Sequence, residues 1–337
     1  MIRNLAIVTP VFDDWRSFAM LAADIAGQFD REEIAIQLCA VDDGSLARFA
    51  PEAIALPPDS CVVGVEVIRL ALNLGHQRAI AVGLCEMAER PEFDAVVVMD
   101  SDGEDRPSDI ASLVAASRER PDSIVLARRT KRSEPPAFRL WYRLYQLVFW
   151  LLTGQAIRFG NFALLPMSAV SRLVYMPELW NHLAASIIRS SLPYLEVPTA
   201  RGARLAGRSR MNVTSLIVHG LSALSVQTDR IFVRVLLAAV GLAAVAGLGI
   251  VVVTAIRFGT DLAIPGWATT AVGDLMIILL QTLVIVVAAT LPMLAGRSSR
   301  PVLPIADAGR YVLDRQRVAF GRSPSGTAAA RTTAAAE

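Results

Sequence analysis

Pairs of acidic residues stand at two points where a short apolar run of the sequence ends. Asp42 and Asp43 follow one run, and Asp100 and Asp102 follow another. Such carboxylates repel a diphosphate directly, but they bind one through Mg²⁺ or Mn²⁺, because these hard cations accept carboxylate and phosphate oxygens together. A solvated acidic turn is the commoner explanation of an isolated Asp-x-Asp pattern, whereas a position at the end of a buried strand favours function. We therefore expect a metal site at Asp100 and Asp102 that holds a phosphorylated ligand.

Basic residues are clustered in two other segments of the sequence. Arg129 and Arg132 follow an apolar run, and Arg204 and Arg210 flank Ser209 shortly before a long hydrophobic stretch. For a single arginine, a solvated face or general attraction to anionic lipid is an adequate explanation. As a set, these arginines favour phosphate binding, because the guanidinium group binds phosphate with bidentate geometry.

The elements that must position these side chains alternate between strand and helix. The expected strands are 5–9, 34–41, 62–69, 94–99 and 124–127, and the expected helices include 15–29 and 76–89. This alternation predicts an α/β domain over residues 1–210 with a mostly parallel, Rossmann-like sheet covered on both faces. Ligands bind such sheets at the carboxyl ends of the strands, where the acidic pairs fall. The sequence lacks G-x-G-x-x-G after its first strand and G-x-x-x-x-G-K-[ST] throughout, so a dinucleotide-binding dehydrogenase and a P-loop enzyme lose their main support.

Two uncharged stretches, 235–256 and 275–295, are each long enough to cross a bilayer as a helix. They define an expected transmembrane hairpin within residues 231–296. Arginines flank the outer ends of the hairpin at Arg230, Arg234, Arg297 and Arg300, whereas the connecting loop has Arg257 alone. The positive-inside rule then predicts a multi-pass protein of the cytoplasmic membrane, with the catalytic domain and both termini in the cytoplasm.

The segments that border the hairpin have their own patterns. Residues 211–230 have helical spacing of apolar side chains, which predicts an amphipathic helix on the membrane surface; a helix packed on the first domain is nearly as good an interpretation. Residues 297–337 are expected to form a cytoplasmic tail that is partly disordered. The net charge is only +2, which gives no reason to expect nucleic acid as a partner. The three cysteines, Cys39, Cys61 and Cys85, are expected to be buried thiols.

Taken together, the motifs resemble family 2 glycosyltransferases with the GT-A fold. The matching segments are 9–12 (TPVF), 41–45 (VDDGS), 73–79 (NLGHQRA), 100–107 (DSDGEDRP) and 160–162 (GNF). Within the family they resemble the polyprenyl-phosphate branch, which includes dolichyl-phosphate mannose synthase and bacterial undecaprenyl-phosphate glucosyl and aminoarabinosyl transferases. An Arg-x-x-Arg motif of that branch is matched by Arg129 and Arg132, and a Gly-x-Ser-Lys motif is matched by residues 207–210 with arginine in the last position.

The resemblance implies roles for individual residues. The nucleotide-sugar site that it implies comprises Pro10, Val11, Asp13, Asp42, Asp43, Arg78, Asp100, Ser101 and Asp102. The implied acceptor-phosphate site comprises Arg129, Arg132, Arg204, Ser209 and Arg210. The candidate catalytic residues are Asp102, Asp105, Asn161, Arg129 and Arg132, and the metal ligands are Asp100 and Asp102.

One departure from the family pattern concerns the catalytic base. Many members have an aspartate where this chain has Asn161, which cannot accept a proton. A lipid phosphate needs no such base, because its second pKa lies near 6 and it is largely deprotonated at neutral pH. A buried amide that stabilises the loop is an equally good interpretation of Asn161.

The resulting hypothesis is inverting, metal-assisted transfer of a sugar from a nucleotide-sugar donor to an undecaprenyl-type polyprenyl phosphate. Transfer to another membrane lipid, such as diacylglycerol, and a non-catalytic scaffold with a degenerate transferase domain are the alternatives. A processive polysaccharide synthase is disfavoured because the Q-x-x-R-W motif is missing. The resemblance also implies a homo-oligomer, with a tetramer as one candidate.

Overall fold

The structure is a computed structural model that describes residues 2–30, 33–57, 59–129, 146–155, 160–206, 213–260, 264, 266–298, 300–321 and 329–334. The chain divides into two compact units, and each is considered by itself. The first unit comprises Met1–Trp141, Ile157–Val226 and Val302–Glu337, and the second comprises Tyr142–Ala156 and Gln227–Pro301. The chain therefore passes from the first unit into the second and back twice.

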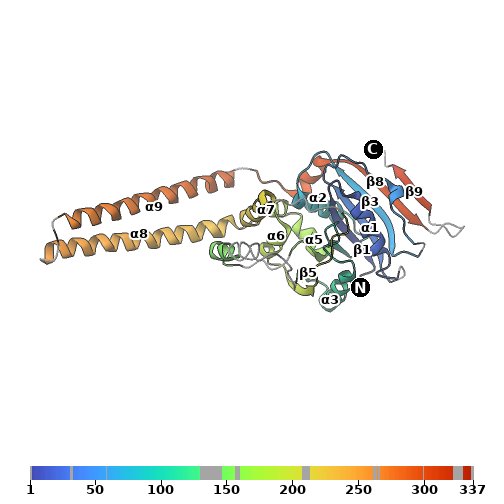
Figure 1. Ribbon diagram of the computed structural model, residues 1–337, viewed down its shortest axis with the longest axis horizontal. Helices are drawn as coiled ribbons and strands as arrows, with labels where there is room; N and C mark the ends of the chain where they lie inside the picture. The colour runs from blue at the N-terminus through green and yellow to red at the C-terminus, as the bar shows by residue number, and fades with distance from the viewer. Residues whose placement is uncertain are drawn as a thin grey trace. The chain divides into compact units, whose positions relative to one another are not determined.

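A mixed sheet with helices on both faces forms the first unit (Figure 1). Its strand order is β7-β5-β6-β4-β1-β2-β3-β8-β9. The strands are β1 (Asn4–Val11), β2 (Ala35–Asp42), β3 (Val62–Leu70), β4 (Ala95–Val98), β5 (Ile124–Arg129), β6 (Ala163–Pro166), β7 (Tyr194–Thr199), β8 (Val312–Gly321) and β9 (Ala329–Ala334). The α/β fold class and the first five expected strands are confirmed.

The helices cover the sheet because alternate strand residues point to opposite faces. Leu5 and Ile7 of β1 pack with α1 (Trp15–Ala26) and α3 (Ser108–Glu119) on one face. Ala6 and Val8 pack on the other face, which is covered by α2 (His76–Ala88), α5 (Met167–Leu173) and α6 (Leu183–Ser190). Gly83 lets α2 approach the sheet closely, since a Cβ there would collide with side chains of Val8 and Val41. The short helices η1 (Pro51–Ala53) and η2 (Pro177–Trp180) lie in connecting segments.

The sheet is mostly parallel, as predicted, and β6 and β8 run in the opposite direction to its other strands. β1, β2, β3 and β4 run parallel, but β6 is antiparallel to both β4 and β5. β8 and β9 extend the other edge in antiparallel pairing. A strand that reaches an open edge without a crossover connection can pair in this antiparallel sense.

Residues 297–337 were expected to form a separate tail, but the structure places part of this segment in the catalytic sheet. After α10 (Pro304–Asp307) and η3 (Ala308–Tyr311), β8 pairs with β3 over the register Gly64↔Ala319 to Leu70↔Val312. A buried carboxylate reinforces the pairing: Glu66 on β3 accepts hydrogen bonds from Arg90 at 2.7 Å and from Arg317 on β8 at 3.0 Å. The folded domain is thus completed by residues that follow the hairpin.

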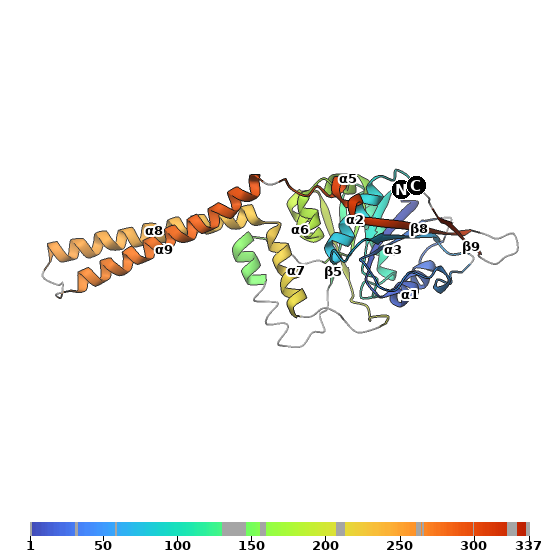
Figure 2. The ribbon, with the colours of Figure 1, turned by 90° about the horizontal axis from the view of Figure 1, so that it is seen from above.

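Two long apolar helices dominate the second unit, α8 (Thr228–Gly259) and α9 (Trp267–Ser298). They run side by side as a hairpin (Figure 2). Both are long and apolar enough to cross a membrane, and most of their side chains are exposed. A core helix of a soluble protein would be mostly buried, so this exposure agrees with the predicted hairpin. The segment before it contains α7 (Val213–Ser225), on which Val218 and Leu221 are exposed whereas Ala223 is buried.

Candidate active site

The loop after β4 gathers carboxylates at the carboxyl end of the strand. The backbone N–H of Asp100 donates to Asp105 Oδ2 at 3.0 Å, and that of Glu104 donates to Asp102 Oδ1 at 2.9 Å. Gly103 has a φ of +84°, and a Cβ at this position would collide with the side chain of Leu205. A glycine is therefore required for this turn, which fixes the acidic side chains in a compact loop.

Residues 201–206 lie over this acidic loop. The backbone N–H of Gly202 donates to the Glu104 carbonyl, and that of Leu205 donates to the Asp102 carbonyl, each at 2.8 Å. Arg204 contacts Asp102 with 3.0 Å between Nη1 and Oδ2. The same guanidinium reaches Asp14 Oδ2 at 3.5 Å. Arg204 was expected to bind acceptor phosphate; here it neutralises the carboxylate that was expected to hold a metal.

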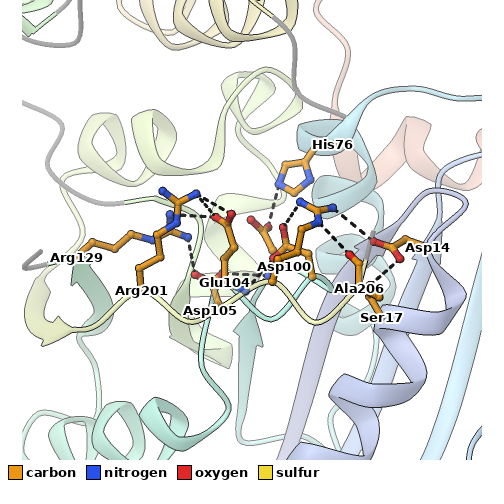
Figure 3. Close-up of polar contacts among 11 residues, drawn as sticks. Asp14, Ser17, His76, Asp100, Glu104, Asp105, Arg129, Arg201 and Ala206 are labelled. Atoms are coloured by element: carbon orange, nitrogen blue, oxygen red, sulfur yellow. Dashed lines mark hydrogen bonds and ion pairs between the residues drawn. The ribbon is translucent and has the colours of Figure 1, made fainter. Parts of the chain in front are cut away.

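Two further arginines form ion pairs with other carboxylates of the acidic loop. Arg129 Nη2 lies 3.0 Å from Asp105 Oδ1, and Arg201 pairs with Glu104 at 2.6 Å (Figure 3). Burial, followed by the negative charge of Asp100, raises the pKa of Asp105 to about 7, although Arg129 acts in the opposite direction. Burial also raises the pKa of Asp102. A cation that binds at this loop would relieve charge that the fold has partly removed from water.

His76, the first residue of α2, lies beside the acidic loop. Its Nε2 is 3.2 Å from Asp100 Oδ1 and 3.0 Å from Asn161 Nδ2. Burial lowers the pKa of His76, but the carboxylates of Asp100, Asp105 and Asp43 outweigh it, so the pKa is raised overall. His76 therefore connects the Asp100 loop electrostatically with the acidic turn after β2.

The acidic turn after β2 is held by its own hydrogen bonds. Asp43 accepts from the backbone N–H of Leu74 at 2.7 Å and from that of Gly75 at 3.0 Å, which binds it to the start of α2. Burial raises the pKa of Asp43 to about 6. Asp42 is buried and accepts from the backbone N–H of Ser45 at 2.8 Å. Asp13 accepts from the backbone N–H of Leu46 at 2.8 Å, so it too orders this turn.

The remaining expected site residues have different outcomes. Pro10 and Val11 end β1, and the Val11 carbonyl accepts from the backbone N–H of Asp43 at 2.8 Å. Ser101 is buried in the acidic loop. Arg78 does not contact the carboxylates; its guanidinium lies over the Trp180 ring, 5.9 Å from the centroid. Arg132, Ser209 and Arg210 lie outside the described residues.

The donor atoms of the site fit a hard divalent cation in part. Asp100 and Asp102 supply carboxylate oxygens, the ligands that Mg²⁺ and Mn²⁺ accept. Within the described part of the chain, no group of three or more His, Cys, Asp or Glu side chains is arranged to hold a metal on its own. An ion at these carboxylates would therefore complete its coordination with oxygens of substrate and water.

Several residues that the sequence analysis did not select belong to the site, among them His76, Gln77, Asp14, Glu104 and Arg201. His76 and Gln77 had a usable signal, because they begin a helix directly after the end of β3, at the ligand-binding edge of the sheet. Arg201 had no such sequence signal, since its pairing with Glu104 joins segments that are far apart in the sequence.

Parts of this chain are similar in sequence to known glycosyltransferases. Residues 6–173 match the family described as Glycosyl transferase family 2. Over 130 residues the chain is 32% identical to the undecaprenyl-phosphate 4-deoxy-4-formamido-L-arabinose transferase of Shewanella sediminis; the match covers 38% of this chain and 37% of that protein. It is 22% identical to an uncharacterized glycosyltransferase of Synechocystis, over 82% of this chain and 86% of the relative.

A solved structure is similar in fold over part of this chain. Glucosyl-3-phosphoglycerate synthase from Mycobacterium tuberculosis, crystallised with Mn²⁺, uridine diphosphate and glucosyl-3-phosphoglycerate, superposes with a TM-score of 0.48. The sequence identity is 15%, and the match covers 68% of this chain and 80% of that one.

Proposed function

Because this chain carries a glycosyltransferase family 2 domain, we propose that it transfers a sugar, with inversion, from a nucleotide-sugar donor to an undecaprenyl-type polyprenyl phosphate. The observation that carries the proposal is a carboxylate and arginine site in a unit whose chain segments both precede and follow two long apolar helices. A polyprenyl chain remains in the hydrocarbon layer while its phosphate reaches an enzyme at the surface. The named activity of the Shewanella relative supports the same acceptor class.

The pairing of β8 with β3 supports the membrane topology in this proposal. β3 precedes the hairpin and β8 follows it, yet the two strands share hydrogen bonds. If α8 and α9 each cross the bilayer, both ends of the hairpin lie on the side that holds the catalytic unit. The flanking arginines Arg230, Arg234 and Arg300 favour the cytoplasmic side.

On the donor side, Asp42, Asp43 and Asp13 order the turn that we assign to the nucleoside, together with Pro10, Val11 and Ser101. Asp100 and Asp102 would hold Mg²⁺ or Mn²⁺, which supplies Lewis-acid stabilisation of the departing diphosphate. Asp105 fixes Arg129 and the Asp100 backbone, so its contribution is to position charged groups.

On the acceptor side, a phosphate oxygen attacks the anomeric carbon of the sugar as the bond to the nucleoside diphosphate breaks. The phosphate needs charge relief and orientation more than a base. We assign this role to Arg129, and also to Arg204 once it leaves Asp102. Arg132, Ser209 and Arg210 are proposed to contribute as well. Asn161 offers hydrogen bonds and accepts no proton in this scheme.

We also propose that the chain forms a homo-oligomer through the hairpin. Gln281 is exposed near the middle of the span Trp267–Gly296. An amide without a hydrogen-bond partner in hydrocarbon is costly, whereas a neighbouring helix can supply a partner.

The decisive experiment is a screen of nucleotide sugars with the purified full-length protein, with undecaprenyl phosphate and diacylglycerol offered as separate acceptors. We expect sugar transfer to undecaprenyl phosphate, which mild acid then releases. Asp102→Asn should lower the rate about 100-fold or more, because it removes transition-state charge stabilisation. Asp24→Asn, at an exposed position of α1, is the matched control. Transfer to diacylglycerol alone would overturn the acceptor assignment, and donor binding without turnover of any sugar would favour a scaffold.

A further inference from the structure

A chain of hydrogen bonds runs from the start of α6 to the acidic site, and its first bond has a fixed direction. The backbone N–H of Leu183 donates to Gln77 Oε1 at 2.8 Å. It is one of the N–H groups that a helix leaves without an internal partner at its N-terminus. A backbone N–H can only donate, so the side-chain oxygen of buried Gln77 must face Leu183 and its NH₂ group must face the other way.

That orientation determines the orientation of Asn161. Gln77 Nε2 donates to Asn161 Oδ1 at 3.1 Å, which uses the Asn161 oxygen. Asn161 Nδ2 is consequently the atom turned toward the site, where it lies 3.0 Å from His76 Nε2. The oxygen and nitrogen of an amide are ordinarily assigned by inference. Here the backbone N–H of Leu183, two hydrogen bonds away from Asn161, determines which atom of the Asn161 amide is oxygen and which is nitrogen.

The neighbourhood of His76 shows what the Asn161 NH₂ group is available for. His76 Nε2 also lies 3.2 Å from Asp100 Oδ1. One ring nitrogen cannot donate to Asp100 and accept from Asn161 at the same time. In the tautomer that donates to Asp100, the Asn161 NH₂ group needs another acceptor. A phosphate oxygen suits this place best, because it accepts hydrogen bonds and never donates them when ionised.

We propose that Gln77 is a positioning residue that locks Asn161 with its NH₂ group toward the site, so that Asn161 donates to a phosphate oxygen of the substrate. This inference rests on the proposed function for the identity of that phosphate: the donor diphosphate and the lipid phosphate present the same chemistry. Gln77 acts through Asn161 and touches no reacting atom. An ionised aspartate at position 161 would have no N–H group and could not donate this hydrogen bond.

Gln77→Glu tests the inference because it reverses the direction of the hydrogen bond between residue 77 and Asn161. A glutamate still accepts from the Leu183 N–H, so the start of α6 keeps its partner. It cannot donate to Asn161, whose amide then rotates and presents Oδ1 to the site. With the full-length protein and Mn²⁺, the probes are pyrophosphate for the donor site and farnesyl phosphate for the acceptor site. We expect the Kd of at least one probe to rise about 10-fold or more, as for a lost hydrogen bond to a charged group.

Three controls separate positioning from other effects. Gln28→Glu, at the C-terminal end of α1, adds the same charge away from the site. Gln77→Met keeps the bulk of the side chain without a donor and should weaken the same probe if Gln77→Glu folds poorly. In an Asn161→Ala background, Gln77→Glu should raise the Kd of the affected probe by less than twofold, because its effect passes through Asn161. If Gln77→Glu raised the Kd as much in that background as in the wild-type protein, the cause would be charge repulsion and the proposal would be overturned.

The two probes also distinguish the sources of phosphate. A loss confined to pyrophosphate assigns Asn161 to the donor, and a loss confined to farnesyl phosphate assigns it to the acceptor. Unchanged affinity for both, or no binding of either probe to the wild-type protein, overturns the inference. If probe binding depends on Gln77 while no sugar is transferred in the nucleotide-sugar screen, the proposed function fails and the positioning role stands.

Discussion

Asp102 and Arg204 form an ion pair at the centre of the site, with 3.0 Å between Asp102 Oδ2 and Arg204 Nη1. The proposed metal must compete with this guanidinium for the carboxylate. Arg204→Ala should therefore raise the affinity for Mn²⁺ about fivefold, which corresponds to a partly exposed ion pair of about 1 kcal/mol. Sugar transfer should nevertheless fall about 10-fold or more, because the phosphate loses a charged contact. Titration of Mn²⁺ followed by electron paramagnetic resonance measures the first effect.

Arg201→Ala is the matched control for that experiment. Arg201 comes from the same segment but pairs with Glu104, so its removal should leave the Mn²⁺ affinity within twofold. A lower Mn²⁺ affinity in Arg204→Ala would mean that Arg204 supports the metal site.

Asp43 predicts a pH dependence of stability. Burial raises its pKa from 3.8 to about 6, so the folded state binds this proton more tightly than the unfolded state does. The resulting stabilisation is fully present below pH 3.8 and is lost as the pH rises through about 6. Its size is up to about 3 kcal/mol, at 1.36 kcal/mol for each pKa unit. Thermal unfolding of Asp43→Asn between pH 4 and pH 7 should follow a flatter profile than that of the wild type, roughly by this amount.

Asp24→Asn serves as the control for the pH profile, since Asp24 is exposed on α1. Identical pH profiles for Asp43→Asn and the wild type would refute the assignment.

The buried carboxylate of Glu66 predicts how strongly the returning strand is held. Glu66→Gln should destabilise the protein by about 3 kcal/mol, because it leaves Arg90 without its charged partner in a buried position. Arg317→Ala should lower the free energy of unfolding by about 1 kcal/mol, since the side chain of this arginine is 59% exposed. Thermal or denaturant unfolding in detergent gives both values. Glu86→Gln, which loses a more exposed pair with Arg315, should cost less than Glu66→Gln.

Gln281 gives a test of the proposed homo-oligomer. Gln281→Leu should weaken self-association about fivefold, which corresponds to about 1 kcal/mol for a hydrogen bond between membrane helices. Gln281→Cys should form disulfide-linked dimers in oxidised membranes. Leu280→Cys, one residue away on another side of α9, is the matched control. Equal cross-linking at both positions would argue against a specific contact at Gln281.

Sequence patterns predicted the parts of this protein that depend on local composition. The apolar runs ending at Asp42 and Asp100 identified two strands, because their burial on both faces requires continuous hydrophobic residues. The hairpin followed from length and hydropathy alone. These features are encoded within a short stretch of residues and need no knowledge of distant contacts.

The features that were not predicted depend on contacts between distant segments. β8 carries a run of four polar residues, 314–317, between apolar ends, and we assigned it to a tail. Its partner β3 lies about 250 positions earlier, as in the contact of Arg317 with Glu66. Arg204 was assigned to phosphate because its charge is visible in the sequence, whereas its approach to Asp102 is not. The contact of the Arg78 guanidinium with the Trp180 ring, 5.9 Å from its centroid, likewise joins distant segments and was not predicted.

The position of β8 has a consequence for the order in which the protein is made. β3 leaves the ribosome with an unpaired edge, and its partner strand is synthesised only after both apolar helices. The catalytic sheet therefore remains incomplete until both helices of the proposed transmembrane hairpin have been synthesised. A chain in which only one helix crosses would carry β8 to the opposite side and leave the β3 edge open to aggregation or proteolysis. In the proposed topology, completion of the sheet would act as a check on insertion, because only molecules with both helices inserted would finish folding.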